Sequence, residues 1–235
     1  MSSQSALPNS ISLAGKTAIV TGGSRGIGAG IALELASRGA NVALVYHSES
    51  STAKAEKVAA QIAELGRKAA LIRVDLSSLE CGQQVIHQTL AQLKVPHIDI
   101  LVNNAAADPP FRPLLETDFG EFERSSILTR MGGSNLSIYT ATKSALEGLT
   151  RHWAHELAKT YKLTVNTIAL GEIAVDSTPQ EVTDEFRDAQ LDLPSAARRF
   201  GTIEEVAQVA AFLASAGSSW INGGSIPASG GSYYW

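Results

Sequence analysis

A tyrosine, a lysine and a serine stand at spacings that suit proton transfer. Tyr139 and Lys143 lie four residues apart in the segment YTATK, so on a helix they share one face. A free tyrosine titrates at about 10, and a nearby ammonium group lowers that pKa by favouring the phenolate. Ser126, thirteen residues before Tyr139, can donate a hydrogen bond to a substrate carbonyl. These residue types suit acid–base chemistry at a carbonyl or alcohol oxygen.

The segment TGGSRGIG, residues 21–28, has the composition of a phosphate-binding turn. An apolar run precedes it, and residues at helical spacing follow it. Gly22, Gly26 and Gly28 permit a sharp turn and a close approach of the backbone to a ligand. The N-terminus of the following helix offers unpaired N–H groups to a diphosphate. A glycine-rich turn alone is a weak signal, but the order strand, glycines, helix indicates a dinucleotide site.

The residues after the second predicted strand bear on the choice of dinucleotide. A site specific for NAD usually has an acid there to bind the ribose 2′-hydroxyl, whereas this chain has His47 and Ser48. Arg25 in the glycine turn can pair with a 2′-phosphate, which favours NADPH over NADH. Glu49 leaves the alternative open, because it can be the missing acid shifted along the turn.

Two polar residues stand at the predicted carboxyl ends of later strands. Asp75, after the third strand, can accept a hydrogen bond from the adenine amine or can cap the next turn. Asn104, after the fourth, lies where strand ends meet a bound dinucleotide, or it ties two strands together.

Strand and helix patterns alternate along the chain. This alternation predicts parallel pairing through right-handed crossovers, in a doubly wound, mostly parallel α/β sheet that forms a single domain over residues 1–235. The polar, proline-broken segment 176–200 is typical of a mobile flap over a site. Apolar runs predict strands at 17–22, 42–46, 70–75, 98–105, 163–170 and 223–231, and helical spacing predicts helices at 26–38, 51–66, 79–94, 137–160 and 203–215.

Composition and charge exclude several kinds of partner. The net charge is −4 without a run of like charges, so neither nucleic acid nor an anionic membrane is expected as a partner. The single cysteine, Cys81, cannot form an internal disulfide, and no Cys/His cluster has metal-ligand spacing. The N-terminal stretch lacks the pattern of a secretory signal, and no apolar run reaches membrane-spanning length. We therefore expect a cytoplasmic protein that acts on a small molecule.

These motifs resemble the short-chain dehydrogenase/reductase family, in its NADP-dependent ketoreductase branch, over nearly the whole chain. The resemblance rests on TGGSRGIG, Asp75, NNA at 103–105, Ser126 and YTATK; the C-terminal part resembles acyl-carrier ketoreductases and fungal polyketide or alcohol reductases. It implies a Rossmann-like three-layer sandwich and an NADP(H)-dependent oxidoreductase that reduces a ketone or oxidises a secondary alcohol. With the residues considered above, the expected site comprises catalytic Ser126, Tyr139 and Lys143, and cofactor-binding Gly22, Ser24, Arg25, Gly26, Ile27, Gly28, His47, Ser48, Asp75, Asn104, Tyr139, Lys143 and Ile173.

The stretch FERSSIL, residues 122–128, joins two pieces of chain that the family keeps apart. Family members have a helix and a strand between the fourth strand and the catalytic serine, whereas a short proline-containing segment separates Ala105 from Ser126 here. By comparison with the family, a central helix and strand of roughly twenty to thirty residues are absent. Smaller departures from the family pattern are Ala106 for glycine, Leu170 for proline and Val175 for threonine.

Three hypotheses follow from this shortening. The chain is an active oxidoreductase that tolerates it, a redox-inactive dinucleotide-binding protein, or a truncated isoform of a working enzyme. The retention of Ser126, Tyr139 and Lys143 together favours the first. The alanine-rich face of the helix at 137–160 resembles the family's subunit-contact helix, which implies a homo-oligomer.

Overall fold

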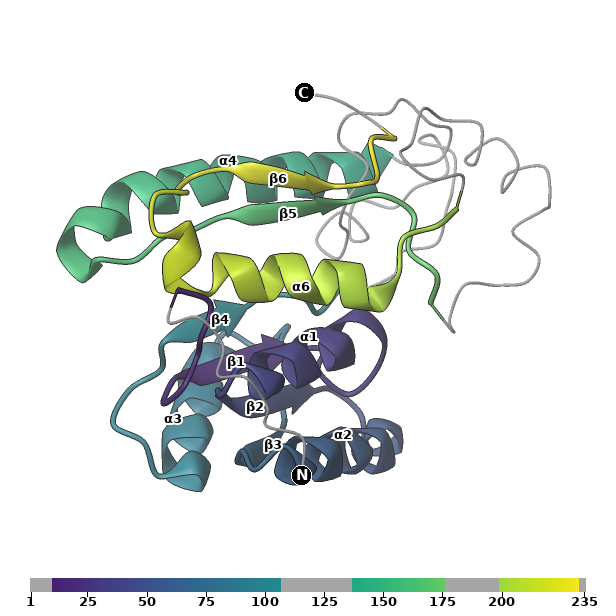
Figure 1. Ribbon diagram of the computed structural model, residues 1–235, viewed down its shortest axis with the longest axis vertical. Helices are drawn as coiled ribbons and strands as arrows, with labels where there is room; N and C mark the ends of the chain where they lie inside the picture. The colour runs from purple at the N-terminus through teal and green to yellow at the C-terminus, as the bar shows by residue number, and fades with distance from the viewer. Residues whose placement is uncertain (1–9, 107–136, 176–198, 233–235) are drawn as a thin grey trace. The chain divides into compact units, whose positions relative to one another are not determined.

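The structure is a computed structural model that describes residues 10–106, 137–175 and 199–232 (Figure 1). Contacts group the chain into two compact units. The first unit holds residues up to 105, residues 168–219 and the segment from 227 onward; the second holds 106–167 and 220–226. The single domain over 1–235 stays a prediction.

A four-stranded parallel sheet forms the centre of the first unit. Its order is β3-β2-β1-β4, so the first strand of the chain lies inside the sheet. All three pairings are parallel, as predicted, and they place Tyr46 beside Arg73 at one carboxyl end and Val20 beside Val102. The strands are β1 (Thr17–Thr21), β2 (Asn41–Tyr46), β3 (Ala69–Arg73) and β4 (Ile100–Val102).

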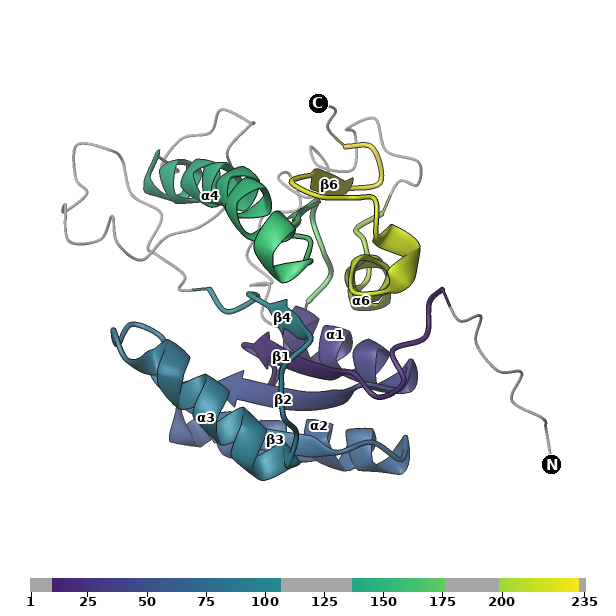
Figure 2. The ribbon, with the colours of Figure 1, turned by 90° about the vertical axis from the view of Figure 1, so that its left-hand side faces the viewer.

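Helices cover both faces of this sheet (Figure 2). Helices α1 (Gly26–Ser37) and α2 (Thr52–Glu64) pack on one face, where Leu35 and Leu44 are fully buried. Helix α3 (Cys81–Leu93) packs on the other. Successive side chains of a strand point to opposite faces, so the buried run of β1 supplies both cores. The doubly wound α/β prediction is confirmed.

The observed strands are shorter than the predicted ones at the sheet's edges. β4 covers three residues rather than 98–105, because side chains replace the ladder bonds at both of its ends. Thr21 Oγ1 accepts hydrogen bonds from the backbone N–H of Asn104 and of Ala105, each at 2.9 Å. The Asp99 carboxylate accepts one from Thr17 N, also at 2.9 Å. β3 ends two residues before Asp75.

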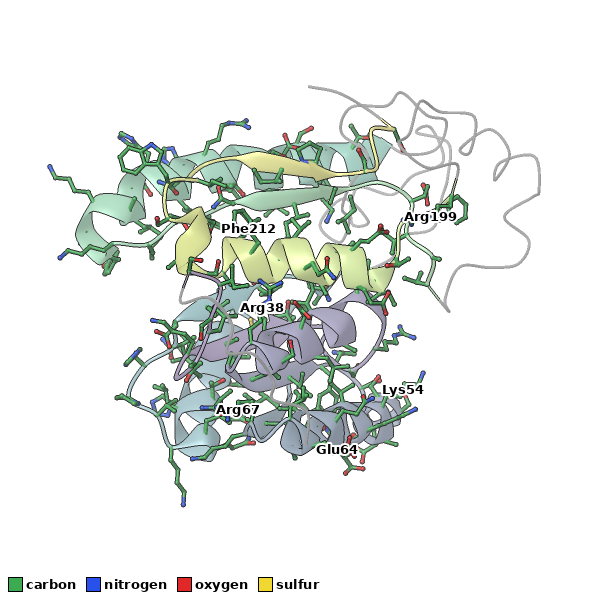
Figure 3. The ribbon with its side chains drawn as sticks, viewed as in Figure 1. Arg38, Lys54, Glu64, Arg67, Arg199 and Phe212 are labelled. Carbon is green, nitrogen blue, oxygen red and sulfur yellow. The ribbon has the colours of Figure 1, made fainter. Side chains whose placement is uncertain are left out.

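Helix α6 (Ile203–Leu213) packs directly against α1 in the first unit (Figure 1). The approach requires a glycine at Gly30, because a Cβ there would lie 2.1 Å from Ile203 Cγ2. α6 begins with a capping box, in which Thr202 Oγ1 accepts from Glu205 N and the Glu205 carboxylate accepts from Thr202 N. Arg199, labelled in Figure 3, donates two hydrogen bonds to the same carboxylate, at 2.6 and 2.9 Å.

Replacing Thr202 with alanine is expected to lower the free energy of unfolding by about 1 kcal/mol, because the Glu205 N–H loses its acceptor. Urea denaturation measures the change. Ser51→Ala is the matched control, since Ser51 occupies the same N-cap position of α2 without accepting a cap bond. An equal loss in both variants would show that the Thr202 cap contributes nothing of its own.

The second unit contains helix α4 (Ser137–Tyr161) and the segment around 220–226. Asparagine side chains join these parts. Asn166 Nδ2 donates to Ile221 O at 2.9 Å, and Asn222 Nδ2 donates to Ala154 O at 3.2 Å. These bonds fix α4 to the chain that follows it.

Strands β5 (Thr167–Leu170) and β6 (Ser225–Ala228) form a separate two-stranded sheet. Thr167 N donates to Gly224 O and Gly171 N donates to Ala228 O, so the strands run parallel. Among the described residues β4 pairs only with β1, and no strand joins the two sheets. The sequence predicts a missing strand at this place; the segment 107–136, which includes FERSSIL, lies outside the described residues.

In the part of the chain that the structure describes, no helix is both long and apolar enough to cross a membrane.

Candidate active site

The glycine turn connects β1 to α1 in the first unit. Arg25, the N-cap of α1, is extended and exposed, and its side chain makes no cap bond. Ser24 is buried. The first N–H groups of a helix have no acceptor within the helix and carry the positive end of its dipole. The amino end of α1, which includes Ile27, is therefore suited to bind an anion.

The backbone of this turn requires glycine at positions 22 and 28. Gly22 has a φ of +67°, and a Cβ on Gly28 would lie 2.3 Å from Gly22 O and 2.5 Å from Asn104 Nδ2. Any side chain at Gly28 would force the turn away from the end of β4. Gly26 also has a positive φ, but a Cβ there would meet nothing within 4 Å. The residues present fit a dinucleotide diphosphate, because they leave backbone N–H groups unobstructed at a helix N-terminus.

Asn104 ties the ends of β1 and β4 together. Its Nδ2 donates to Thr21 O at 2.9 Å. The second role predicted for Asn104 from the sequence, that of tying two strands together, is thus observed. Among the described residues its Oδ1 makes no hydrogen bond, so the predicted contact with a ribose is still compatible with this arrangement.

The polar residues that follow β2 and β3 lie together in the same unit. Asp75 Oδ1 accepts from Ser77 N at 2.9 Å, which is the turn-capping role, and His47 Nδ1 lies 3.7 Å from the same oxygen. Ser48 Oγ is within 3.0 Å of two neighbouring serine hydroxyls. The contact of Asp75 with adenine stays a prediction.

Glu49 forms an ion pair with Arg73, the last residue of β3. The pairing brings together a residue that follows β2 and one that ends the adjacent strand, so only the sheet register reveals it. Because the Glu49 carboxylate already has this cationic partner, it must leave Arg73 or share it in order to bind the ribose 2′-hydroxyl of NAD.

Ile173 lies just beyond β5, in an isolated parallel bridge with Gly201. Gly201 N donates to Glu172 O and Ala174 N donates to Gly201 O, both at 2.9 Å. The bridge joins the two ends of the segment 176–198, which lies outside the described residues. Ile173 also packs against the core that contains α1 and α6.

Lys143 lies on α4 in the second unit, one turn after Tyr139. Burial lowers the pKa of its ammonium group from 10.5 to about 8, so at neutral pH it keeps most of its charge. The backbone of Tyr139 belongs to the first turn of α4; its side chain, like Ser126, lies outside the described part of the chain.

The structure therefore groups most predicted cofactor residues in one unit and places Tyr139 and Lys143 in the other. Sequence reasoning missed Thr21 and Arg73; the available signals were a polar residue and a charged residue at the ends of two apolar strands. The first unit holds Gly22, Ser24, Arg25, Gly26, Ile27, Gly28, His47, Ser48, Asp75, Asn104 and Ile173.

A parallel sheet whose first strand leads through a glycine turn into a helix defines a dinucleotide-binding α/β protein. The family model described as "short chain dehydrogenase" matches residues 16–125, and the one described as "Enoyl-(Acyl carrier protein) reductase" matches residues 123–233. The chain belongs to the short-chain dehydrogenase/reductase family. It is an oxidoreductase of the kind that acts on CH–OH or C=O groups.

Similar proteins include fungal enzymes and a bacterial structure. The chain is 38% identical to the short-chain dehydrogenase/reductase FrzI of Cladobotryum sp, over 94% of this chain and 96% of FrzI. It is 32% identical to the hydroxynaphthalene reductase arp2 of Aspergillus fumigatus, over 90% of each. A Burkholderia cenocepacia short chain dehydrogenase in complex with NADP aligns with a TM-score of 0.82 at 30% identity, covering 94% of this chain and 98% of that one.

The alignment with FrzI extends over 253 positions, more than the 235 residues of this chain. FrzI therefore has residues without a counterpart here. The two family models meet at residues 123–125, inside FERSSIL. Both observations agree with the predicted shortening.

Proposed function

We propose that this chain is an NADP(H)-dependent ketoreductase that reduces a ketone or oxidises the corresponding secondary alcohol. The single observation that carries the proposal is the glycine turn, which leads β1 into the uncapped N-terminus of α1 and is packed so closely that a Cβ on Gly28 would clash with Gly22 O. The Burkholderia cenocepacia relative with NADP and the exposed Arg25 support NADP(H) over NAD.

The residues of the chain divide the work of binding and proton transfer. Gly22, Gly28 and the amino end of α1 hold the diphosphate, and Arg25 pairs with the 2′-phosphate. Bound NADPH supplies the hydride for the carbonyl carbon. Tyr139 donates the proton to the carbonyl oxygen, and the Lys143 cation keeps the phenol pKa low enough for that role.

Three further features belong to the same proposal. Ser126 donates a hydrogen bond to the substrate carbonyl, and Ile173 contacts the nicotinamide amide. The hydroxynaphthalene reductase among the relatives supports an aromatic ketone as substrate and a place in fungal secondary metabolism. We further propose that the enzyme works in the cytoplasm as a homo-oligomer, through the alanine-rich face of α4.

A turnover assay with NADPH and a panel of ketones, bicyclic aromatic ketones included, tests the function. We expect NADPH consumption with at least one ketone, and a loss of about 100- to 10,000-fold in kcat for Tyr139→Phe, the usual contribution of a positioned proton donor. Because Tyr139 is also an expected cofactor-binding residue, calorimetry measures the NADPH affinity of the variant separately from its kcat. The absence of NADPH binding by the wild-type protein would overturn the proposal.

A second candidate function is dinucleotide binding without catalysis. The alignment with FrzI favours it, because that alignment extends over more positions than this chain has residues. On this alternative the chain binds a dinucleotide without turnover, as a redox-inactive protein or as a truncated isoform of a working enzyme. NADPH binding without consumption across the whole panel would favour it. Sequencing the transcripts distinguishes its two forms, because a longer transcript exists only for the isoform.

A further inference from the structure

Arg73 stands at the carboxyl edge of the sheet, beside the end of β2. It is the last residue of β3 and is in register with Tyr46, the last residue of β2. Side chains alternate along β3: Leu71 packs against the core containing α1 and α2, whereas Ile72 packs against the core containing α3. Arg73 therefore projects toward the α1–α2 face, the face on which the glycine turn enters its helix.

The guanidinium of Arg73 has an exchangeable partner. Its ion pair with Glu49 is open to water, with 49% of the arginine side chain and 84% of the glutamate side chain exposed. Exposed ion pairs contribute little to stability. A phosphate dianion binds a guanidinium more strongly than one carboxylate does, because it offers more charge and a bidentate geometry. A phosphate placed here can therefore replace Glu49.

Arg73 ends β3 on one side of β2, and the glycine turn that carries Arg25 follows β1 on the other side. β1 and β3 are the two neighbours of β2, so with strands about 4.8 Å apart their carboxyl ends lie about 10 Å from each other. His47 and Ser48 follow β2 between them. The ribose of a dinucleotide bound at this sheet edge lies at the end of β2, so a 2′-phosphate there is within reach of long cationic side chains from both sides.

We propose that Arg73 is a second cation for the 2′-phosphate of NADPH, and that Glu49 pairs with it when the phosphate is absent. The inference rests on the proposed function, since it concerns the same dinucleotide. Glu49 then lowers the affinity for NADPH by competing for Arg73. Glu49 does not oppose the binding of NADH, because the 2′-hydroxyl of NADH can donate a hydrogen bond to the Glu49 carboxylate. The Glu49–Arg73 pair thus sets how strictly this chain selects NADPH.

Calorimetric titration with 2′,5′-ADP and with 5′-AMP tests the inference without turnover, because these probes differ only in the 2′-phosphate. We expect Arg73→Gln to weaken 2′,5′-ADP binding by about tenfold, the effect of one charge-assisted hydrogen bond, and to leave 5′-AMP unchanged. Glu49→Gln should strengthen 2′,5′-ADP binding several-fold. Both side chains are exposed, and thermal unfolding of the variants checks that the fold is kept.

Arg67→Gln is the matched control. Arg67, labelled in Figure 3, precedes β3 and lies about 20 Å from Arg73 along the chain direction of the strand. The Arg67→Gln substitution removes the same charge as Arg73→Gln. Its 2′,5′-ADP affinity should match that of the wild type. Equal losses in both arginine variants, or no loss in Arg73→Gln, would overturn the inference while leaving the function standing. Failure of the wild-type protein to bind either 2′,5′-ADP or NADPH would overturn the function itself.

Discussion

Gly28→Ala is expected to abolish measurable NADPH binding, with a loss of affinity of roughly 100-fold or more, equivalent to about 2.7 kcal/mol. The added Cβ would lie 2.3 Å from Gly22 O, a contact that only a backbone shift can relieve. That shift moves the N–H groups that hold the diphosphate in the proposed complex, and it strains the Asn104 contact with β1. Fluorescence quenching or calorimetry with NADPH measures the loss.

The control for this variant is another glycine in the same unit. Gly82 lies in α3, where a Cβ would meet nothing within 4 Å. Gly82→Ala should bind NADPH as the wild type does and should unfold at a slightly higher denaturant concentration, since alanine favours a helix by roughly 0.5–1 kcal/mol over glycine. Unchanged binding in Gly28→Ala, with its fold verified by circular dichroism, would show that the turn does not hold the diphosphate.

Lys143→Met is expected to lower kcat by about 100- to 10,000-fold, because in the proposed mechanism the Lys143 cation favours the Tyr139 phenolate. The wild-type pH profile should reflect the same group. The pKa of Lys143 is lowered to about 8, so the ammonium loses its proton above that pH and ketone reduction should decline there. Steady-state kinetics with a ketone substrate between pH 6 and pH 10 measures both effects, a range of about two units either side of the lowered pKa.

The pH dependence of folding stability tests the lowered pKa of Lys143 independently of catalysis. Between pH 8 and 10.5 the unfolded chain binds the lysine proton more strongly than the folded one, so wild-type stability should rise with pH across this window. Lys143→Met removes the rise. Lys159→Met, in the exposed last turn of α4, is the control and should keep the wild-type kcat and the rise. A similar loss of kcat in both variants would contradict the proposed role of Lys143 in proton transfer.

The order and type of the elements could be predicted from the sequence, because apolar periodicity reports burial directly. The runs that became β1 and β2 are buried on both faces, as a parallel sheet requires. The glycine turn could also be placed, since its residue types and its position between a strand and a helix are both local properties of the chain.

Other features depend on contacts between distant segments and could not be predicted. The Glu49–Arg73 pair follows from the register of β2 with β3, and Asn104 takes its structural role from Thr21, more than eighty residues earlier. Local sequence patterns contain neither the register of β2 with β3 nor the identity of the residue that Asn104 contacts. The shortened ends of β4 have the same origin, because the side chains of Thr21 and Asp99 belong to different parts of the chain.

The bridge between Ile173 and Gly201 has a consequence for insertions into the chain. The bridge and the Arg199–Glu205 pair hold the residues on either side of positions 176–198 in place, so residues added between those positions need not disturb β1, the glycine turn or α1. Lengthening a chain segment whose two ends are fixed adds little entropic cost, about 0.6 kcal/mol per doubling. The length of this segment can therefore vary during evolution at little cost in stability.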